Sequence, residues 1–158
     1  MIKEQFQASY KLLKKHLKDI DEDKATFQPN VANNNIKWQL GHLILLNDFL
    51  VFETINGENA LNQTAAKYFL WGTSPTDFDG NEPSFKELNL LLDEQFDRIF
   101  NRLEKQLMKD RKEAIILKDA DIVMENFNES IHFAILHTNR HFGQIVLLKS
   151  MINKLSTS

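Results

Sequence analysis

The sequence contains no cysteine among its 158 residues. This absence excludes a disulfide framework, a thiolate nucleophile and every cysteine-based zinc or iron–sulfur site. Any metal site in this chain must therefore use histidine, aspartate or glutamate as its ligands.

Long apolar runs and long basic runs are also missing. No stretch approaches the length of a membrane span, and the first five residues lack the continuous apolar segment of a signal peptide. The 19 basic and 22 acidic side chains leave a net charge of −3, and the lysine cluster between Lys11 and Lys18 is typical of a solvated helix face. We therefore expect a cytoplasmic protein that binds neither nucleic acid nor membranes.

Length and composition indicate an ordinary globular chain. The hydrophobic fraction is 42% and the charged fraction is 26%, which argues against disorder and against a fibrous repeat. A chain of this length can bury one sizeable core, whereas two independent cores would each be small. We predict a single domain over residues 1–158.

Apolar residues at intervals of three and four predict long amphipathic helices. The predicted helices cover residues 2–20, 36–56, 84–109, and a final stretch from 126 or 128 to 153. Asn35 is expected to cap the second helix, and Ser84 with Glu87 is expected to form a capping box at the start of the third. Four such segments without a convincing strand predict an all-α four-helix bundle.

The segments between the helices are predicted to be loops, at residues 21–35, 57–83 and 110–125. Gly57 is expected to end the second helix, and a short helix is expected within the next loop at residues 65–70. Loops as long as this one often have a functional use, such as a lid. The third loop contains one short apolar run, Ala114–Leu117.

Two histidines, His137 and His141, lie four residues apart in the last predicted helix. That spacing places both on the same side of the helix, one turn from each other. They are in line with the apolar residues Ala134 and Ile145 and therefore face the interior of the bundle. His42 has the same kind of position on the second predicted helix, and a buried imidazole needs a polar partner.

Two interpretations of these three histidines are open. Each ring could bond separately to a backbone carbonyl or to an amide such as Gln144 or Asn47. Alternatively, a single divalent cation satisfies all three rings, and three histidine ligands with an open position are typical of a catalytic metal site. We predict His42, His137 and His141 as metal ligands, and imidazole suits zinc, nickel, copper and iron alike.

The remaining histidines fit a metal site less well. Glu129 and His132 have the Glu-x-x-His spacing of di-iron bundles, but such proteins need two of these motifs and further glutamates. His132 also lies five residues before His137, which rotates it off the ligand face. His16 stands among lysines and is interpreted as a surface residue. HExxH, a glycine-rich phosphate loop and GxSxG do not occur.

Two segments, Asn35–Leu43 and Ser130–Ile145, resemble the signature helices of the DinB/YfiT-like superfamily. The first metal histidine of that family matches His42. Its His-x-x-x-His pair, followed by x-Gly-Gln, matches His137, His141, Gly143 and Gln144. Thr138 stands where many members have glutamate.

The resemblance implies an up-down-down-up four-helix bundle, often dimeric, with a nickel, zinc or similar ion in a cleft. Characterised members include thiol S-transferases and isomerases that use bacillithiol, mycothiol or glutathione. We therefore expect a homodimeric, metal-dependent transferase that acts with a low-molecular-weight thiol on a small-molecule substrate, or a metal-dependent hydrolase. The alternative is a non-catalytic, stress-associated protein whose metal or helices serve stability or partner binding.

The absence of cysteine means that the nucleophile of such an enzyme must be an external thiol or water. Aromatic side chains near the proposed ligands are expected to form walls of the substrate site, namely Trp38, Phe142 and the segment from Tyr68 to Trp71. No catalytic residue beyond the metal ligands can be assigned.

Overall fold

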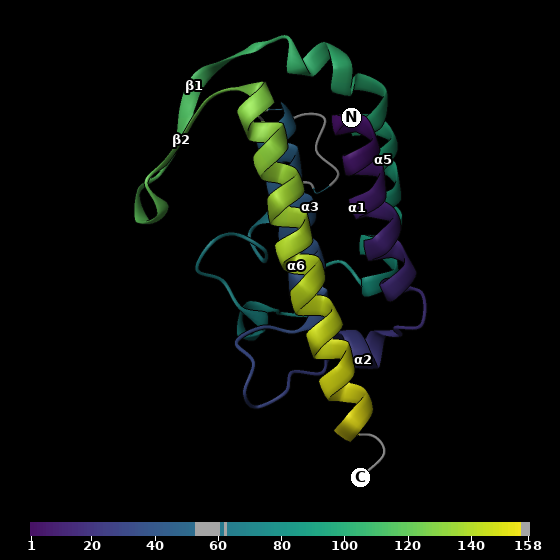
Figure 1. The fold of residues 1–158 in the computed structure, drawn as a ribbon. Helices are drawn as coiled ribbons and strands as arrows, with labels where there is room; N and C mark the ends of the chain where they lie inside the picture. The colour runs from purple at the N-terminus through teal and green to yellow at the C-terminus, as the bar shows by residue number, and fades with distance from the viewer. Residues whose placement is uncertain (53–60, 62, 156–158) are drawn as a thin grey trace.

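The computed structural model describes residues 1–52, 61 and 63–155 (Figure 1). Within these residues the chain forms four long helices, α1 Ile2–Leu17, α3 Ile36–Phe52, α5 Phe85–Leu107 and α6 Phe127–Leu155. Shorter elements connect them: the helices α2 Glu22–Thr26 and α4 Gln63–Ala66, the 3-10 turns η1 Pro75–Asp77 and η2 Lys118–Ala120, and the strands β1 Asp110–Leu117 and β2 Ile122–Asn126. The prediction of a mostly helical protein is confirmed.

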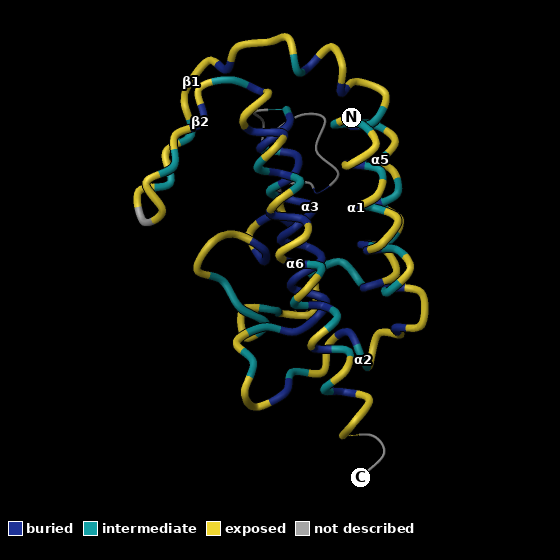
Figure 2. The backbone as a smooth tube through the Cα atoms, viewed as in Figure 1, coloured by how far each residue is buried: buried dark blue, intermediate teal, exposed yellow. Residues whose placement is uncertain are grey.

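Helix α3 is the most deeply buried element of the molecule. It packs against α2, α5 and α6, and Figure 2 shows it in dark blue along most of its length. A helix that is apolar on nearly all sides is expected to be surrounded by protein. The helix begins as the sequence predicts, because the Asn35 Oδ1 atom accepts a hydrogen bond of 2.8 Å from the backbone N–H of Trp38.

Helix α5 buries one face and exposes the other. The predicted apolar stripe contributes Leu88, Leu92, Ile99 and Leu103 to the core. The predicted capping box is confirmed, since the Ser84 hydroxyl oxygen accepts from the N–H of Glu87 at 3.2 Å and the Glu87 carboxylate accepts from the N–H of Ser84 at 2.7 Å.

The last described turn of α3 is capped by side chains from other elements. The final carbonyl groups of a helix have no partner within the helix itself. Gln106 of α5 donates to the Val51 carbonyl at 2.9 Å, and Arg111 of β1 donates to the Leu50 carbonyl at 2.9 Å. The predicted end of this helix near Asn56 and Gly57 lies outside the described residues.

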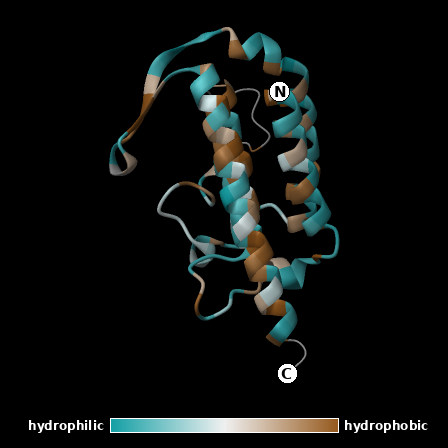
Figure 3. Cartoon of the chain, viewed as in Figure 1, coloured by the Kyte–Doolittle hydropathy of each residue, from teal (hydrophilic) through white to brown (hydrophobic). Residues whose placement is uncertain are grey.

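Residues 110–126 correct the expectation of an all-α fold without strands. This segment, predicted as a loop, forms an antiparallel pair in which Ile115 is opposite Met124 and Leu117 is opposite Ile122. Met124 is buried, and its partners on this face pack against the core to which α1, α3, α5 and α6 contribute. Figure 3 shows the apolar stretch as brown segments of the otherwise hydrophilic hairpin.

The hairpin was not predicted, because the alternation of apolar and polar residues that indicates a strand is divided between two short strands. Each strand places only two or three apolar residues on the inner face, which is too few to stand out in a polar segment. The turn between the strands uses Asp121 in the left-handed region, at φ 52°, a conformation that aspartate tolerates better than most residues.

Other boundaries differ by smaller amounts. Helix α1 ends at Leu17 rather than residue 20, and the short helix expected at residues 65–70 lies at Gln63–Ala66. Helix α2 occupies part of the loop predicted at 21–35, because Asp21 caps it by accepting from the N–H of Lys24 at 2.9 Å. In the described part of the chain, no helix combines the length and the apolar character that crossing a membrane requires.

Candidate metal centre

Three histidines from two helices converge at one point in the structure. His42 comes from α3, and His137 and His141 come from α6. One ring nitrogen from each lies within 4.8 Å of the other two, and the residues are only 4%, 9% and 5% exposed. No other group of three metal-ligating side chains was found among residues 1–52, 61 and 63–155.

The packing of α3 along α6 brings these rings together. The His42 ring centroid lies 5.5 Å from that of His137 and 5.1 Å from that of His141. Near the cluster, the Asn47 amide of α3 donates to the Thr138 hydroxyl of α6 at 3.1 Å. Thr138 therefore joins the two helices.

Hydrogen bonds at Nδ1 orient two of the three rings. The His42 Nδ1 atom lies 2.7 Å from the carbonyl oxygen of Phe69, and the His141 Nδ1 atom lies 2.5 Å from the Oε1 atom of Gln39. Both oxygens are acceptors, so Nδ1 carries the proton in each ring. The Nε2 atoms of His42 and His141 are then the nitrogens that carry lone pairs, as in metal-binding histidines generally.

The third ring is held differently. The His137 Nε2 atom lies 3.0 Å from the His141 Nε2 atom, while its buried Nδ1 atom has no hydrogen-bond partner among the described residues. A buried polar nitrogen without a partner is uncommon. In a tetrahedral zinc site with bonds of about 2.1 Å, ligand nitrogens are roughly 3.4 Å apart. The ring nitrogens of the cluster lie within 4.8 Å of one another, so small movements of the rings bring them to the spacing that a divalent ion needs.

The electrostatics of the cluster favour the neutral imidazole. Burial lowers the pKa of His137 to about 3, with a smaller contribution from His42. Burial also lowers the pKa of His141 to about 2, and it lowers the pKa of His42. All three rings are therefore neutral at pH 7, which is the form that binds a metal ion.

The segment after α4 closes one side of the cluster. A Cβ atom at Gly41 of α3 would lie 2.4 Å from the ring of Phe69. Only glycine therefore allows this segment to approach α3 closely enough for the Phe69 carbonyl to reach His42. The Trp38 ring stacks on His42 with centroids 4.7 Å apart, and its indole N–H donates to the Thr73 hydroxyl at 3.0 Å.

Aromatic side chains also border the cluster on the side that reaches solvent. Trp71 is 73% exposed and stands edge-on to His42 at 6.4 Å. Phe133, one turn before His137 on α6, stacks on that ring at 6.2 Å. The predicted wall residues Trp38 and Trp71 thus lie at the site.

Phe142 does not border the cluster, so the prediction that it forms a wall of the substrate site is wrong. Its ring packs against His16 of α1 at 5.0 Å. Because it follows His141 directly, it is rotated by about 100° around α6 toward α1.

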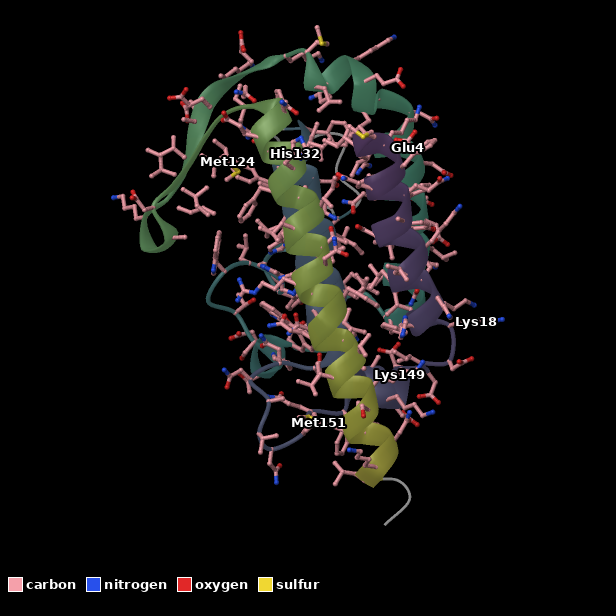
Figure 4. All side chains as sticks on the ribbon, viewed as in Figure 1. Glu4, Lys18, Met124, His132, Lys149 and Met151 are labelled. Carbon is pink, nitrogen blue, oxygen red and sulfur yellow. The ribbon has the colours of Figure 1, made fainter. Side chains whose placement is uncertain are left out.

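The two histidines that the sequence excluded lie outside the cluster. His132 is exposed near the N-terminal end of α6, where Figure 4 labels it. Glu129, its partner in the di-iron spacing, accepts from the backbone N–H of Glu125 at 2.7 Å instead. His16 is half-buried, and its Nδ1 atom lies 3.0 Å from the Leu12 carbonyl oxygen.

Three contributors to the site were not predicted from the sequence. Gln39 lies three residues before His42, which is the spacing of neighbours on one helix face and could have suggested it. The Phe69 carbonyl had no sequence signal, because any residue supplies a carbonyl group. Arg140, between the two histidines of α6, lowers the pKa of all three imidazoles through its charge.

Comparisons with known proteins bear on the family and the fold. Residues 5–145 match the sequence profile of the DinB superfamily. A crystal structure described as the conserved protein of locus from Enterococcus faecalis superposes with a TM-score of 0.64, at 15% sequence identity, over 94% of this chain and 92% of that chain. It shows a shared fold, and no curated protein matches. Since the profile covers most of the sequence, the chain belongs to the DinB superfamily.

Proposed function

We propose that this protein binds one divalent metal ion, such as zinc or nickel, through His42, His137 and His141. The observation that carries the proposal is the convergence of three buried, neutral imidazoles, two of which have their Nδ1 atoms bonded to acceptors. In the competing interpretation, each ring bonds separately to a group of the protein. Such bonds are present at the Nδ1 atoms of His42 and His141 and account for only part of the ring nitrogens. Among the described residues, this interpretation gives the His141 Nε2 atom no partner other than the His137 ring, 3.0 Å away.

We propose further that the protein is a transferase that joins a low-molecular-weight thiol to an electrophilic small molecule, with hydrolysis as a variant. A divalent ion on three imidazoles supplies a Lewis acid that lowers the pKa of a thiol or of water. The chain has no cysteine, so the nucleophile comes from outside. The exposed Trp71 beside His42 supports access from solvent, which a catalytic site needs.

The residues around the cluster have defined tasks in this scheme. The Phe69 carbonyl and Gln39 hold a proton on the Nδ1 atoms of His42 and His141, which directs both Nε2 lone pairs to the common point. Trp38 covers the His42 ring and excludes water from that side. In this scheme, substrate approaches the site from the side of Trp71 and Phe133.

A non-catalytic role in metal binding or in partner interaction is the second candidate. The low exposure of the three histidines favours it, because a closed structural site is also buried. Metal analysis of the purified protein, followed by a conjugation assay with glutathione or bacillithiol and chlorodinitrobenzene, separates the two. A thiol transferase forms conjugate faster with metal than after chelation, whereas a metal-binding protein without transferase activity gives equal rates.

The finer features of the family are also part of the proposal. The course of the chain in Figure 1, with α3 and α5 running in one direction and α1 and α6 in the other, supports an up-down-down-up four-helix bundle. A single domain over residues 1–158, a homodimer and a cytoplasmic location remain our expectations.

A further inference from the structure

Arg140 is a charged side chain beside the histidine cluster, and it has no partner among the described residues. It is exposed, and no hydrogen bond or ion pair joins it to any residue in the described part of the chain. It stands between His137 and His141 in sequence, where a cation disfavours the protonated form of each imidazole. A guanidinium at this place is therefore available to a ligand.

The geometry of α6 places Arg140 on the solvent side of the cluster. With about 3.6 residues per turn, Arg140 lies roughly 60° from His137 around the helix, on the side opposite to His141. Ile145, one turn after His141, is 0% exposed, whereas Leu136, one turn before Arg140, is 63% exposed. His137 thus marks the edge of the core, and Arg140 stands just outside it.

Phe133 and Trp71 flank the same approach to the histidines. Phe133 lies roughly 40° from His137 around α6, on the same side as Arg140, and its ring stacks on that histidine at 6.2 Å. Trp71 approaches from the segment after α4 and meets His42 edge-on at 6.4 Å. A ligand that enters the cluster therefore passes a guanidinium and two aromatic rings.

The charge at this approach has one sign. Among the described residues, no hydrogen bond or ion pair joins a carboxylate to Arg140 or to any of the three histidine rings. A divalent ion on the histidines would add further positive charge. A planar guanidinium without a carboxylate partner binds carboxylates through paired N–H···O hydrogen bonds, which are stronger than neutral ones.

We propose that Arg140, flanked by Trp71 and Phe133, forms a subsite for the carboxylate of a small molecule that reacts at the histidine cluster. The inference rests on the proposed function, since it names the class of ligand that the site takes. The carboxylate belongs either to the thiol or to the electrophile. In both cases its binding places the rest of the molecule over His137 and His42.

A titration with paired probes tests this subsite. Mercaptopropionate carries a thiol and a carboxylate, acrylate carries an electrophilic double bond and a carboxylate, and the methyl ester of each removes only the charge. Binding is followed through the Nε–H resonances of isotope-labelled arginine, with zinc-loaded and with metal-free protein. We expect at least one acid to bind about tenfold or more tightly than its ester and to shift the Arg140 resonance.

Variants then assign the effect to Arg140. Arg140→Gln should remove the preference for the acid while zinc content stays at the wild-type level, and Arg140→Lys should retain part of the preference. Lys11→Gln, which removes one exposed charge from α1, should change neither property. A preference that persists in Arg140→Gln, or wild-type protein that binds both acids no better than their esters, would overturn the proposal.

Failure of this subsite and failure of the proposed function are distinguishable. If the wild-type protein binds no zinc, the metal proposal is wrong, but the titration of the metal-free protein still decides whether Arg140 binds carboxylates. If zinc binds and the acids show no preference, only the subsite is wrong.

Discussion

The Nε2 atoms of His137 and His141 lie 3.0 Å apart and face each other at the edge of the core. Because the His141 Nδ1–H donates to Gln39, its Nε2 atom can only accept. Without metal, the proton of His137 must therefore lie on Nε2 and point to His141, which leaves the His137 Nδ1 atom unsatisfied. An ion shared by both Nε2 atoms gives each of these two nitrogens a bonding partner, and the His137 proton then lies on Nδ1.

Gln39 is expected to control metal affinity without being a ligand. Gln39→Leu removes the acceptor that fixes the proton of His141 and leaves a buried N–H unpaired. Loss of such an outer partner commonly weakens metal binding about 10–100-fold. Competition with a chromophoric zinc chelator should show a decrease in affinity of this size.

Gln95→Leu is the matched control for that experiment. Gln95 is also a buried glutamine, but its amide donates to the Ile44 carbonyl at 2.6 Å. Both variants should lose roughly 1–3 kcal/mol of unfolding free energy. Equal zinc affinities in the two variants would mean that Gln39 does not control metal binding at the site.

Gly41 is expected to be necessary for the position of the segment after α4. Gly41→Ala places a methyl group 2.4 Å from Phe69, so the ring and its carbonyl must move away from His42. We expect a loss of about 1–3 kcal/mol in urea unfolding, as for other overpacked sites, and a weaker affinity for zinc.

Gly143→Ala provides the comparison, because nothing lies within 4 Å of a Cβ atom at this position on α6. Alanine is favoured over glycine inside a helix by roughly 1 kcal/mol. This variant should be as stable as the wild type or more so, with unchanged zinc affinity. A Gly41→Ala protein that matches it in both measurements would contradict the proposed close packing.

The stability of the metal-free protein should decrease as the pH falls below about 6.5. The unfolded chain takes up protons at its imidazoles near that pH, whereas burial lowers the pKa of His137 to about 3 and that of His141 to about 2 in the folded state. The stability is complete above pH 6.5 and is lost as the pH falls toward the lowered values, by up to about 1.4 kcal/mol per pH unit for each ring.

The contribution of one ring can be isolated with His137→Leu. Urea unfolding of the metal-free protein between pH 7 and pH 4 should show a smaller slope of free energy with pH in this variant than in the wild type. Parallel curves would mean that the His137 imidazole is not buried in its neutral form.

The oligomeric state is a separate expectation. Family resemblance predicts a homodimer, and the surface includes an apolar patch around Phe27, Val31 and Leu155, which are 47%, 82% and 58% exposed. Light scattering at tens of micromolar should give a mass near twice 18.4 kDa. A mass that stays at the monomer value over this concentration range would argue against it.

The long helices and the grouping of the histidines were predictable because both depend on periodic spacing. Leu88, Leu92 and Leu103 repeat at helical intervals, and the same periodicity placed His137 and His141 on one face. The helix starts at Asn35 and Ser84 were also predictable, since capping depends on the residue type itself.

The rest depends on contacts between distant parts of the chain. The hairpin at residues 110–126 becomes favourable only where Met124 can pack on α5 and α6, so its short strands had no independent signal. The Phe69 carbonyl reaches His42 across 27 positions of sequence. Nothing in the local sequence marks such a carbonyl, although Gly41 shows in the structure why the approach is tolerated.

Metal content of five histidine variants tests the central claim most directly. His42→Ala, His137→Ala and His141→Ala each remove one of three imidazole donors, so each purified protein should bind zinc at least about a hundredfold more weakly than the wild type, which is a loss of about 2.7 kcal/mol or more. His16→Ala and His132→Ala should retain stoichiometric zinc, because both residues lie outside the cluster. Loss of zinc in His132→Ala together with its retention in His42→Ala would contradict the account, since the ion would then be held near Glu129 and not by the three converging histidines.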